Sequence, residues 1–155
     1  MAYDYDLITI GLGPAGMAVS VMGSEMGLKV CAIEKNKIGG ECMNVGCIPS
    51  KSLLRMAKAR HLFEKLAKME LGESPKPEVL KPFERIDGYL KYINDNKTVG
   101  MFKKVDLILA EGSAEFVDAH TVKVGDRKIS AKRLFIAAGT RPGIPPIPGI
   151  ESIDV

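Results

Sequence analysis

A β-type run followed at once by a glycine-rich turn, a helix and a second β-type run restricts most strongly what this chain can fold into. Residues 5–10 form a short apolar strand that ends at Gly11. Pro14 is tolerated in the first turn of a helix, and Gly27 suits the position just after its last turn. Residues 29–34 form the second strand. Such a unit of about 30 residues predicts a right-handed strand–helix–strand crossover within a parallel sheet.

The turn after the first strand fits the pattern G-x-G-x-x-G. Gly11 permits a tight turn, Gly13 lets a pyrophosphate approach the backbone, and Gly16 allows close packing of helix on strand. The helix that begins here offers free N–H groups and a partial positive charge to phosphates. The residues of this turn that we expect to contact a dinucleotide are Gly11, Gly13, Pro14, Ala15 and Gly16.

Glu34 completes this pattern at the end of the second strand. An acid at this place accepts hydrogen bonds from the ribose hydroxyls of a bound dinucleotide. The alternative is an ordinary α/β domain with a glycine turn and no ligand. We prefer the dinucleotide site because strand, turn, helix and acid all occur in the required order. The motif alone does not distinguish NAD from FAD.

Length and composition favour one soluble domain. The chain has 155 residues, of which 46% are hydrophobic and 26% charged. The net charge of +3 is mild and spread along the sequence, so neither nucleic acid nor a membrane surface is expected as a partner. No apolar run approaches the roughly 18 residues of a membrane span. The N-terminus carries acidic residues rather than the basic region of a signal peptide, which predicts a cytoplasmic protein.

Two of the three cysteines, Cys42 and Cys47, lie five residues apart in a segment with little apolar periodicity. At this spacing they do not face each other in a regular helix. A disulfide needs Cα atoms about 4.4–6.8 Å apart, so the backbone must be distorted there. Gly46 and Pro49 allow that distortion. Cys31, by contrast, lies in an apolar run and is predicted to be a small core residue.

The Cys42–Cys47 pair is predicted to cycle between dithiol and disulfide. A thiol near a helix N-terminus, with Lys51 in reach, is expected to have a depressed pKa. The alternatives are a zinc site and a purely structural bridge. Zinc would need further ligands nearby, and the two histidines, His61 and His120, do not have the required spacing. No metal site is therefore expected.

The remainder of the chain is predicted to have a helical part followed by a part made of short strands. Apolar residues at helical spacing predict one helix over residues 59–69 and a second that begins near Pro82, with a loop at residues 72–77. From residue 106 onward the residue pattern is typical of short β-strands. The expected strands are residues 107–110, 114–117, 121–124 and 127–129, followed by the apolar run 134–138, with hairpin turns at 118–120 and 125–126.

The segment G-G-x-C-x-N-x-G-C-x-P-S-K over residues 39–51 resembles the redox-active signature of the pyridine nucleotide–disulfide oxidoreductases. Dihydrolipoamide dehydrogenase, mercuric reductase and glutathione reductase belong to that family. The resemblance implies an α/β fold, a Rossmann-like FAD-binding three-layer domain with a parallel sheet plus an antiparallel β segment. Residues 1–140 would be the first segment of this domain. Residues 141–155 would be a proline-rich linker towards an NAD(P)-binding domain absent from this chain.

The resemblance also implies roles for individual residues. Cys47 would be the sulfur that meets the flavin, Cys42 the interchange thiol that attacks the substrate, and Lys51 a neighbour of the flavin ring. Ala138 stands where the family commonly has Thr, and Glu41 where Thr or Val is common. The residues implied to contact FAD outside the glycine turn are Glu34, Lys35, Gly40, Glu41, Cys42, Cys47, Lys51, Ser113, Ala114, Ala138 and Gly139.

Within the family, the residues around the cysteines look most like dihydrolipoamide dehydrogenase. Mercuric reductase shares these features, and glutathione reductase is the third candidate. The substrate would then be a small-molecule or lipoyl disulfide, and the full-length protein would be a homodimer. We expect this chain alone to be inactive, to bind FAD poorly and to self-associate. A flavin-binding, redox-sensing module without catalytic activity is the alternative to an enzyme.

Overall fold

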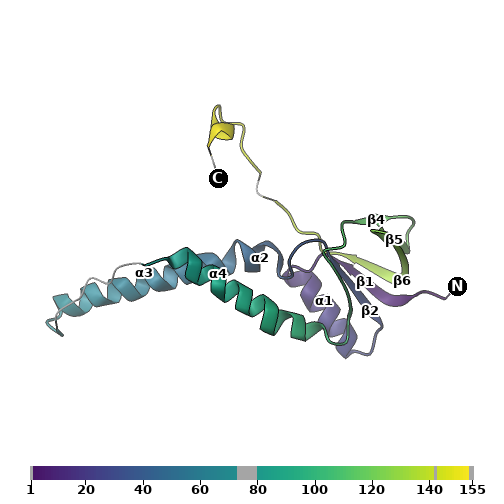
Figure 1. The fold of residues 1–155 in the computed structure, drawn as a ribbon, viewed down its shortest axis with the longest axis horizontal. Helices are drawn as coiled ribbons and strands as arrows, with labels where there is room; N and C mark the ends of the chain where they lie inside the picture. Colours follow the sequence, from purple (N-terminus) through teal and green to yellow (C-terminus); the bar gives the residue numbers. More distant parts are fainter. Residues whose placement is uncertain (1, 73–79, 142, 154–155) are drawn as a thin grey trace.

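The computed structural model describes residues 2–72, 80–141 and 143–153. It contains one six-stranded sheet in the order β3-β2-β1-β6-β5-β4, which lies at one end of the molecule, near the N-terminus (Figure 1). The strands are β1 (Tyr5–Ile10), β2 (Val30–Glu34), β3 (Asp106–Leu109), β4 (Ala114–Phe116), β5 (Thr121–Val124) and β6 (Arg127–Ile136). The helices are α1 (Pro14–Glu25), α2 (Gly40–Asn44), α3 (Cys47–Lys68), α4 (Pro82–Ile93), the π-helix η1 (Asn94–Thr98) and the 3₁₀-helices η2 (Val99–Phe102) and η3 (Ile150–Ser152).

The predicted strand–helix–strand unit is confirmed. Strand β1 pairs in parallel with β2, and the register places Ile8 opposite Cys31. Helix α1 makes the crossover and ends at Glu25; Met26 is its C-cap, after which Gly27 adopts a φ of +85°. This left-handed residue lets the chain turn sharply, and Leu28 N–H then donates to Gly23 O at 3.1 Å. The glycine that the sequence predicted as a helix cap therefore acts as one.

Strand β6 connects the parallel and antiparallel parts of the sheet. Its first half pairs antiparallel with β5, and its second half pairs in parallel with β1. The prediction of a strand at 127–129 separate from the apolar run 134–138 was wrong, because one strand covers Arg127–Ile136. The polar residues between them remain in the strand because Asp4 accepts hydrogen bonds from Ser130 N at 2.8 Å and Ser130 Oγ at 2.7 Å. The predicted hairpins β4–β5 and β5–β6 are confirmed.

Hydrophobic clusters lie on both faces of the parallel strands, which gives three layers. One face packs under α1 and η2 in a core that includes Leu12, Val30, Ile38 and Phe102. On the other face the antiparallel strands contribute to a second core. The members of that core are Tyr5, Ile8, Cys31, Ile33, Ile108, Val122, Val124, Ile129 and Ala131. Because β2 lies between these cores, all five of its residues are buried. The predicted α/β class with a mixed sheet is confirmed.

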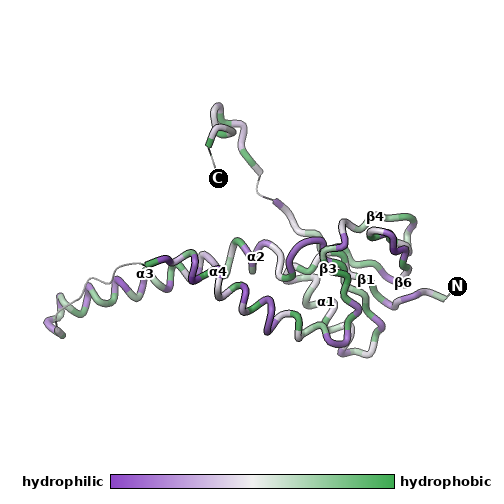
Figure 2. The backbone as a smooth tube through the Cα atoms, in the orientation of Figure 1, coloured by the Kyte–Doolittle hydropathy of each residue, from purple (hydrophilic) through white to green (hydrophobic). Residues whose placement is uncertain are grey.

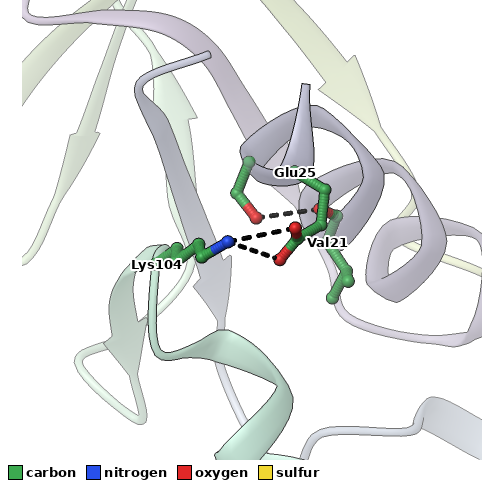
Figure 3. Close-up of polar contacts among 4 residues, drawn as sticks. Val21, Glu25 and Lys104 are labelled. Carbon is green, nitrogen blue, oxygen red and sulfur yellow. Dashed lines mark hydrogen bonds and ion pairs between the residues drawn. The ribbon is translucent and has the colours of Figure 1, made fainter. Parts of the chain in front are cut away.

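An exposed ion pair joins the end of α1 to the segment after η2. Lys104 Nζ lies 3.0 Å from each carboxylate oxygen of Glu25 (Figure 3). In the same turn, Ser24 Oγ donates to Val21 O at 2.8 Å. Both side chains of the ion pair are largely solvent-exposed, so the pair contributes at most about 1 kcal/mol to stability.

Helices α3 and α4 project away from the sheet as a long arm (Figure 1). They confirm both predicted helices. The predicted loop at 72–77 lies outside the described residues except for its first residue. No residue of α3 is buried. Hydrophobic and hydrophilic residues alternate along this helix (Figure 2). Among the described residues, none of the helices has the length and apolar character needed to cross a membrane.

Candidate cofactor and disulfide site

The glycine turn is shaped by very close backbone contacts. Gly11 has a φ of +91°, and its N–H donates to Ile33 O at 2.8 Å. A Cβ atom on Gly11 would lie 2.4 Å from Ala137 O, and one on Gly16 would lie 1.9 Å from Gly11 O. Both positions therefore require glycine for the fold itself. The same contact brings Ala138, which follows the end of β6, beside Gly11.

Gly13 differs from its neighbours because the fold does not require glycine there. Its φ of −68° suits any residue, and an added Cβ would meet only Gly40 Cα, at 3.9 Å. The space in front of Gly13 is therefore open. Helix α1 begins here without a side-chain cap, so N–H groups of its first turn lack intrahelical partners. An open approach to uncapped donors fits a phosphate group.

Glu34 organises the neighbouring backbone with its buried carboxylate. Its Oε2 accepts from Leu12 N and its Oε1 from Asn36 N, both at 2.8 Å. Its backbone oxygen accepts from Ala110 N at 2.8 Å, which fixes the start of the loop that leads to Ser113. A carboxylate oxygen has two lone pairs, so each oxygen keeps acceptor capacity for a ribose hydroxyl.

The two glycines before the first cysteine press the disulfide segment against the glycine turn. Gly39 and Gly40 have φ values of +99° and +55°. Gly39 N–H donates to Leu12 O at 2.7 Å, and a Cβ on Gly40 would lie 2.9 Å from Gly13 Cα. The cysteine segment therefore starts in direct contact with the turn that is predicted to bind a dinucleotide.

The backbone between the cysteines leaves the helical path, as the spacing predicted. Helix α2 ends at Asn44 and α3 begins at Cys47. In the turn between them, Val45 N and Gly46 N both donate to Glu41 O, at 3.0 and 2.8 Å. This turn folds the chain back and brings Cys47 close enough to Cys42 to influence its ionisation. Both thiols are free and half-buried in this structure.

The thiol–thiol contact sets the electrostatics of Cys42. Hydrogen bonding to the Cys47 side chain raises the pKa of the Cys42 thiol, whereas the positive charge of Lys51 acts in the opposite direction. The expectation of a depressed thiol pKa is therefore wrong for Cys42, because the nearby sulfur outweighs the lysine. Cys31 is fully buried, as predicted, and burial raises its pKa to about 12. In the described part of the chain, no three His, Cys, Asp or Glu side chains are grouped as metal ligands.

The predicted contact residues fall into three groups by exposure. Gly16 and Glu34 are buried. Those that are half-buried are Gly11, Gly13, Gly40, Cys42, Cys47 and Ala114. Those that are exposed are Pro14, Ala15, Lys35, Glu41, Lys51, Ser113, Ala138 and Gly139. Within the first two groups, Gly16 lies against Gly11 and Gly40 lies against Gly13, whereas the residues of the third group are open to solvent.

Sequence reasoning assigned no role to Asn44, although it lies inside the cysteine motif. Its Nδ2 donates to Ile38 O at 3.1 Å and Gly40 O at 2.9 Å, and its Oδ1 accepts from Asn94 Nδ2 at 3.3 Å. The position of an Asn between the two cysteines could have indicated that its side chain has a structural role in this loop. Asn94, which lies 50 residues away in the chain, carries no such signal.

Comparison with known proteins places this geometry in a family. The model of the family described as pyridine nucleotide-disulphide oxidoreductase matches residues 5–155. A mercuric reductase of Lysinibacillus sphaericus is 36% identical over 97% of this chain and 28% of its own length. A dihydrolipoyl dehydrogenase of Acholeplasma laidlawii is 33% identical over 97% of this chain and 45% of its own length. A glutathione reductase of Nostoc sp. is 35% identical over 97% of this chain and 33% of its own length.

Solved structures give the same result. The HOCl-induced flavoprotein disulfide reductase RclA from Escherichia coli superposes with a TM-score of 0.75 at 29% sequence identity. The match covers 95% of this chain and 31% of that structure. This chain thus spans less than half the length of each protein compared above.

Proposed function

Because the chain belongs to the pyridine nucleotide-disulphide oxidoreductase family, we propose that it is the FAD-binding, disulfide-carrying part of an NAD(P)H-dependent flavoprotein disulfide oxidoreductase. One observation carries this proposal. Gly40 touches Gly13, so the segment with the two cysteines starts at the turn suited to a dinucleotide. In this proposal residues 1–140 form the first segment of the FAD domain, and NAD(P) binds a domain outside this chain.

The chain's own residues account for cofactor binding. The open space at Gly13 and the uncapped start of α1 would hold the pyrophosphate. Glu34 would accept hydrogen bonds from the ribose hydroxyls while it keeps Leu12 in place. The backbone near Ser113 and Ala114 would contact adenine. When bound, FAD supplies two-electron transfer with the disulfide and with NAD(P)H.

The cysteine pair supplies the exchange chemistry. On oxidation the two thiols lose two electrons and two protons and form one S–S bond, and on reduction they regain them. The turn at residues 41–46 brings Cys47 close enough to Cys42 to raise the pKa of its thiol. Cys42 would attack the substrate disulfide, Cys47 would face the flavin, and the charge of Lys51 favours the thiolate of Cys42.

For the substrate we propose a lipoyl or small-molecule disulfide, as in dihydrolipoamide dehydrogenase. The support is the Asn44–Gly46 and Pro49–Lys51 context together with the dihydrolipoyl dehydrogenases among the relatives. Mercuric reductase is the second candidate because several relatives carry that name, one at 36% identity. Glutathione reductase is the third. A cytoplasmic homodimer is the proposed form of the full-length protein.

A substrate panel with the full-length protein tests these assignments. The purified protein is assayed with dihydrolipoamide and NAD⁺, with NADPH and Hg(II), and with NADPH and glutathione disulfide. We expect a visible flavin spectrum and the highest kcat/KM for dihydrolipoamide. A flavin spectrum with preference for Hg(II) or glutathione disulfide would replace the proposed substrate but keep the class. A flavoprotein inactive with all three, whose disulfide still responds to redox buffer, would support the redox-sensing alternative.

A further inference from the structure

The side-chain amide of Asn44 joins separate parts of the site. Its two N–H groups bind the carbonyl oxygens of Ile38 and Gly40, and its oxygen accepts from Asn94. The amide thus uses both of its donors on the backbone. Ile38 is buried in the core beneath α1, so one of these bonds is anchored to a rigid part of the fold. A side chain bonded in this way restricts the movement of its own backbone.

The position of Asn44 places that restriction on the disulfide loop. It is the last residue of α2, between Cys42 and Cys47 in the chain. Gly40, whose carbonyl oxygen it binds, touches Gly13. One amide therefore ties the loop that carries the two thiols to the turn proposed to bind FAD.

Asn94 is itself held by the core rather than by the free end of the helical arm. It is the first residue of the π-helix η1, a rare conformation that often occurs at functional sites. Buried Thr98 closes this turn, because its Oγ1 donates to Ile93 O at 3.2 Å. Phe102, at the end of η2, packs in the same core as Ile38. Both partners of the Asn44–Asn94 bond are thus connected to one rigid unit.

We propose that Asn44 is a positioning residue that keeps the reduced Cys42–Cys47 loop in the shape required for disulfide formation, with Asn94 as its support. The inference rests on the proposed function of the pair. A restrained dithiol loses less conformational entropy when it closes the S–S bond. Loss of the restraint favours the flexible reduced form, so the disulfide becomes easier to reduce.

A redox titration of the full-length protein tests this role. Wild type and variants are equilibrated with mixtures of dithiothreitol and its cyclic disulfide, quenched with acid and alkylated. On oxidation the two thiols pass two electrons and two protons to the cyclic disulfide, which becomes dithiothreitol. Trypsin cleavage after Lys37 and Lys51 releases residues 38–51, which contain Cys42, Cys47 and Asn44 but not Cys31. The mass of this peptide reports its oxidised fraction without any activity assay.

Three variants and a matched control separate the contacts. Asn44→Ala removes the whole amide, Asn44→Asp keeps an acceptor for Asn94 but removes both donors, and Asn94→Ala removes only the support. Asn44 and Asn94 line an open cavity of about 560 Å³, so shortening either side chain leaves room for water. The control is Asn96→Ala, whose exposed amide donates to Tyr92 O in its own turn, at 3.1 Å.

We expect both Asn44 variants to lower the equilibrium constant for disulfide formation about threefold to tenfold, the range that one or two hydrogen bonds contribute. Asn94→Ala should lower it less, and Asn96→Ala should leave it unchanged. An unchanged constant in folded Asn44→Ala overturns the proposal. If that variant does not fold, Asn94→Ala decides: an unchanged constant there overturns the proposal too. A wild-type protein that forms no Cys42–Cys47 disulfide would instead contradict the proposed function itself.

Discussion

The backbone N–H of Leu12 donates a 2.8 Å hydrogen bond to Oε2 of Glu34, so the glycine turn is held by the acid expected to bind ribose. Glu34 also accepts from Asn36 N at 2.8 Å and is buried. The carboxylate therefore stabilises the turn before any ligand arrives. In this fold one side chain serves both the backbone and the proposed cofactor, and the two roles can be separated by experiment.

Replacing Glu34 by Ala should destabilise the flavin-free protein by about 1–3 kcal/mol, because two backbone N–H groups lose their buried acceptor. Urea unfolding of the apoprotein measures this loss. FAD affinity should fall as well, by a few kcal/mol at most. Glu115→Ala, at an exposed position on β4, is the control and should leave both quantities unchanged. If the Glu34→Ala apoprotein had the stability of the wild type, the hydrogen bonds to Leu12 and Asn36 would not contribute to the free energy of unfolding.

Substitutions at Gly13 and Gly16 should differ in their effects: the first should impair FAD binding, and the second should impair folding. Gly13→Val should fold normally but lose FAD, since only Gly40 lies near the added side chain and the bulk fills the open approach. Gly16→Ala should not fold stably, because its Cβ would lie 1.9 Å from Gly11 O. Circular dichroism and flavin content on gel filtration distinguish the two results. Gly88→Ala, with open space in α4, should affect neither. Normal FAD content in Gly13→Val would refute the assignment of this turn.

The pH at which Cys42 becomes reactive should move in opposite directions in two variants. Hydrogen bonding to Cys47 raises the Cys42 pKa, so Cys47→Ala should lower it and shift the pH midpoint of alkylation downward. The charge of Lys51 lowers the same pKa, so Lys51→Met should shift the midpoint upward. Iodoacetamide rates at Cys42 of the reduced protein measure both shifts. They are read from the tryptic peptide of residues 38–51, or of residues 38–55 in Lys51→Met, where cleavage after Arg55 replaces the lost site. Lys58→Met, further along α3, serves as the charge control. Shifts of the same sign in both variants would disprove this account.

Cys31 should make the fold sensitive to alkaline pH. Burial raises its pKa to about 12 in the folded protein, whereas a thiol in the unfolded chain ionises near about 8.5. The stability that the protonated Cys31 thiol contributes is fully present below the pKa that this thiol has in the unfolded chain. It is lost as the pH rises towards 12. The free energy of unfolding should therefore fall above about pH 9, by at most about 1.4 kcal/mol per pH unit from this group. Cys31→Ala should reduce that slope in urea titrations between pH 8 and 10.5. An equal slope in both proteins would rule out the thiol as its source.

Features set by local sequence were predictable. The strand–turn–helix–strand unit needed only short-range spacing, and the five-residue interval between Cys42 and Cys47 was enough to predict a distorted backbone between them, where the structure places the break between α2 and α3. The roles of Gly11 and Gly27 followed from the turns that required them. These features depend on steric limits that act within a few residues.

Features set by distant partners were not predictable. Strand β6 continues through polar residues because β1 and β5 supply its hydrogen bonds and Asp4 binds Ser130. The raised pKa of Cys42 depends on how closely the turn brings Cys47, a distance that spacing does not determine. The Asn44–Asn94 bond joins residues 50 positions apart. In each case the missing information was tertiary.

The isolated 155-residue chain should self-associate through the arm formed by α3 and α4. A helix of 22 residues with no buried side chain gains little from tertiary packing, and large apolar side chains such as Leu62 and Phe63 remain exposed on it. An exposed apolar surface of this kind favours association. Size-exclusion chromatography with light scattering should show dimers or larger species whose fraction rises with concentration. Leu62→Glu combined with Phe63→Glu should shift the population towards monomer, because charged side chains oppose burial in an interface. Met26→Glu, at an exposed apolar site on the end of α1, adds a charge away from the arm and should leave the association unchanged. A wild-type chain that stays monomeric at every concentration would show that the arm does not drive association. If Met26→Glu changed the association as much as the Leu62 and Phe63 substitutions do, the contact would lie elsewhere.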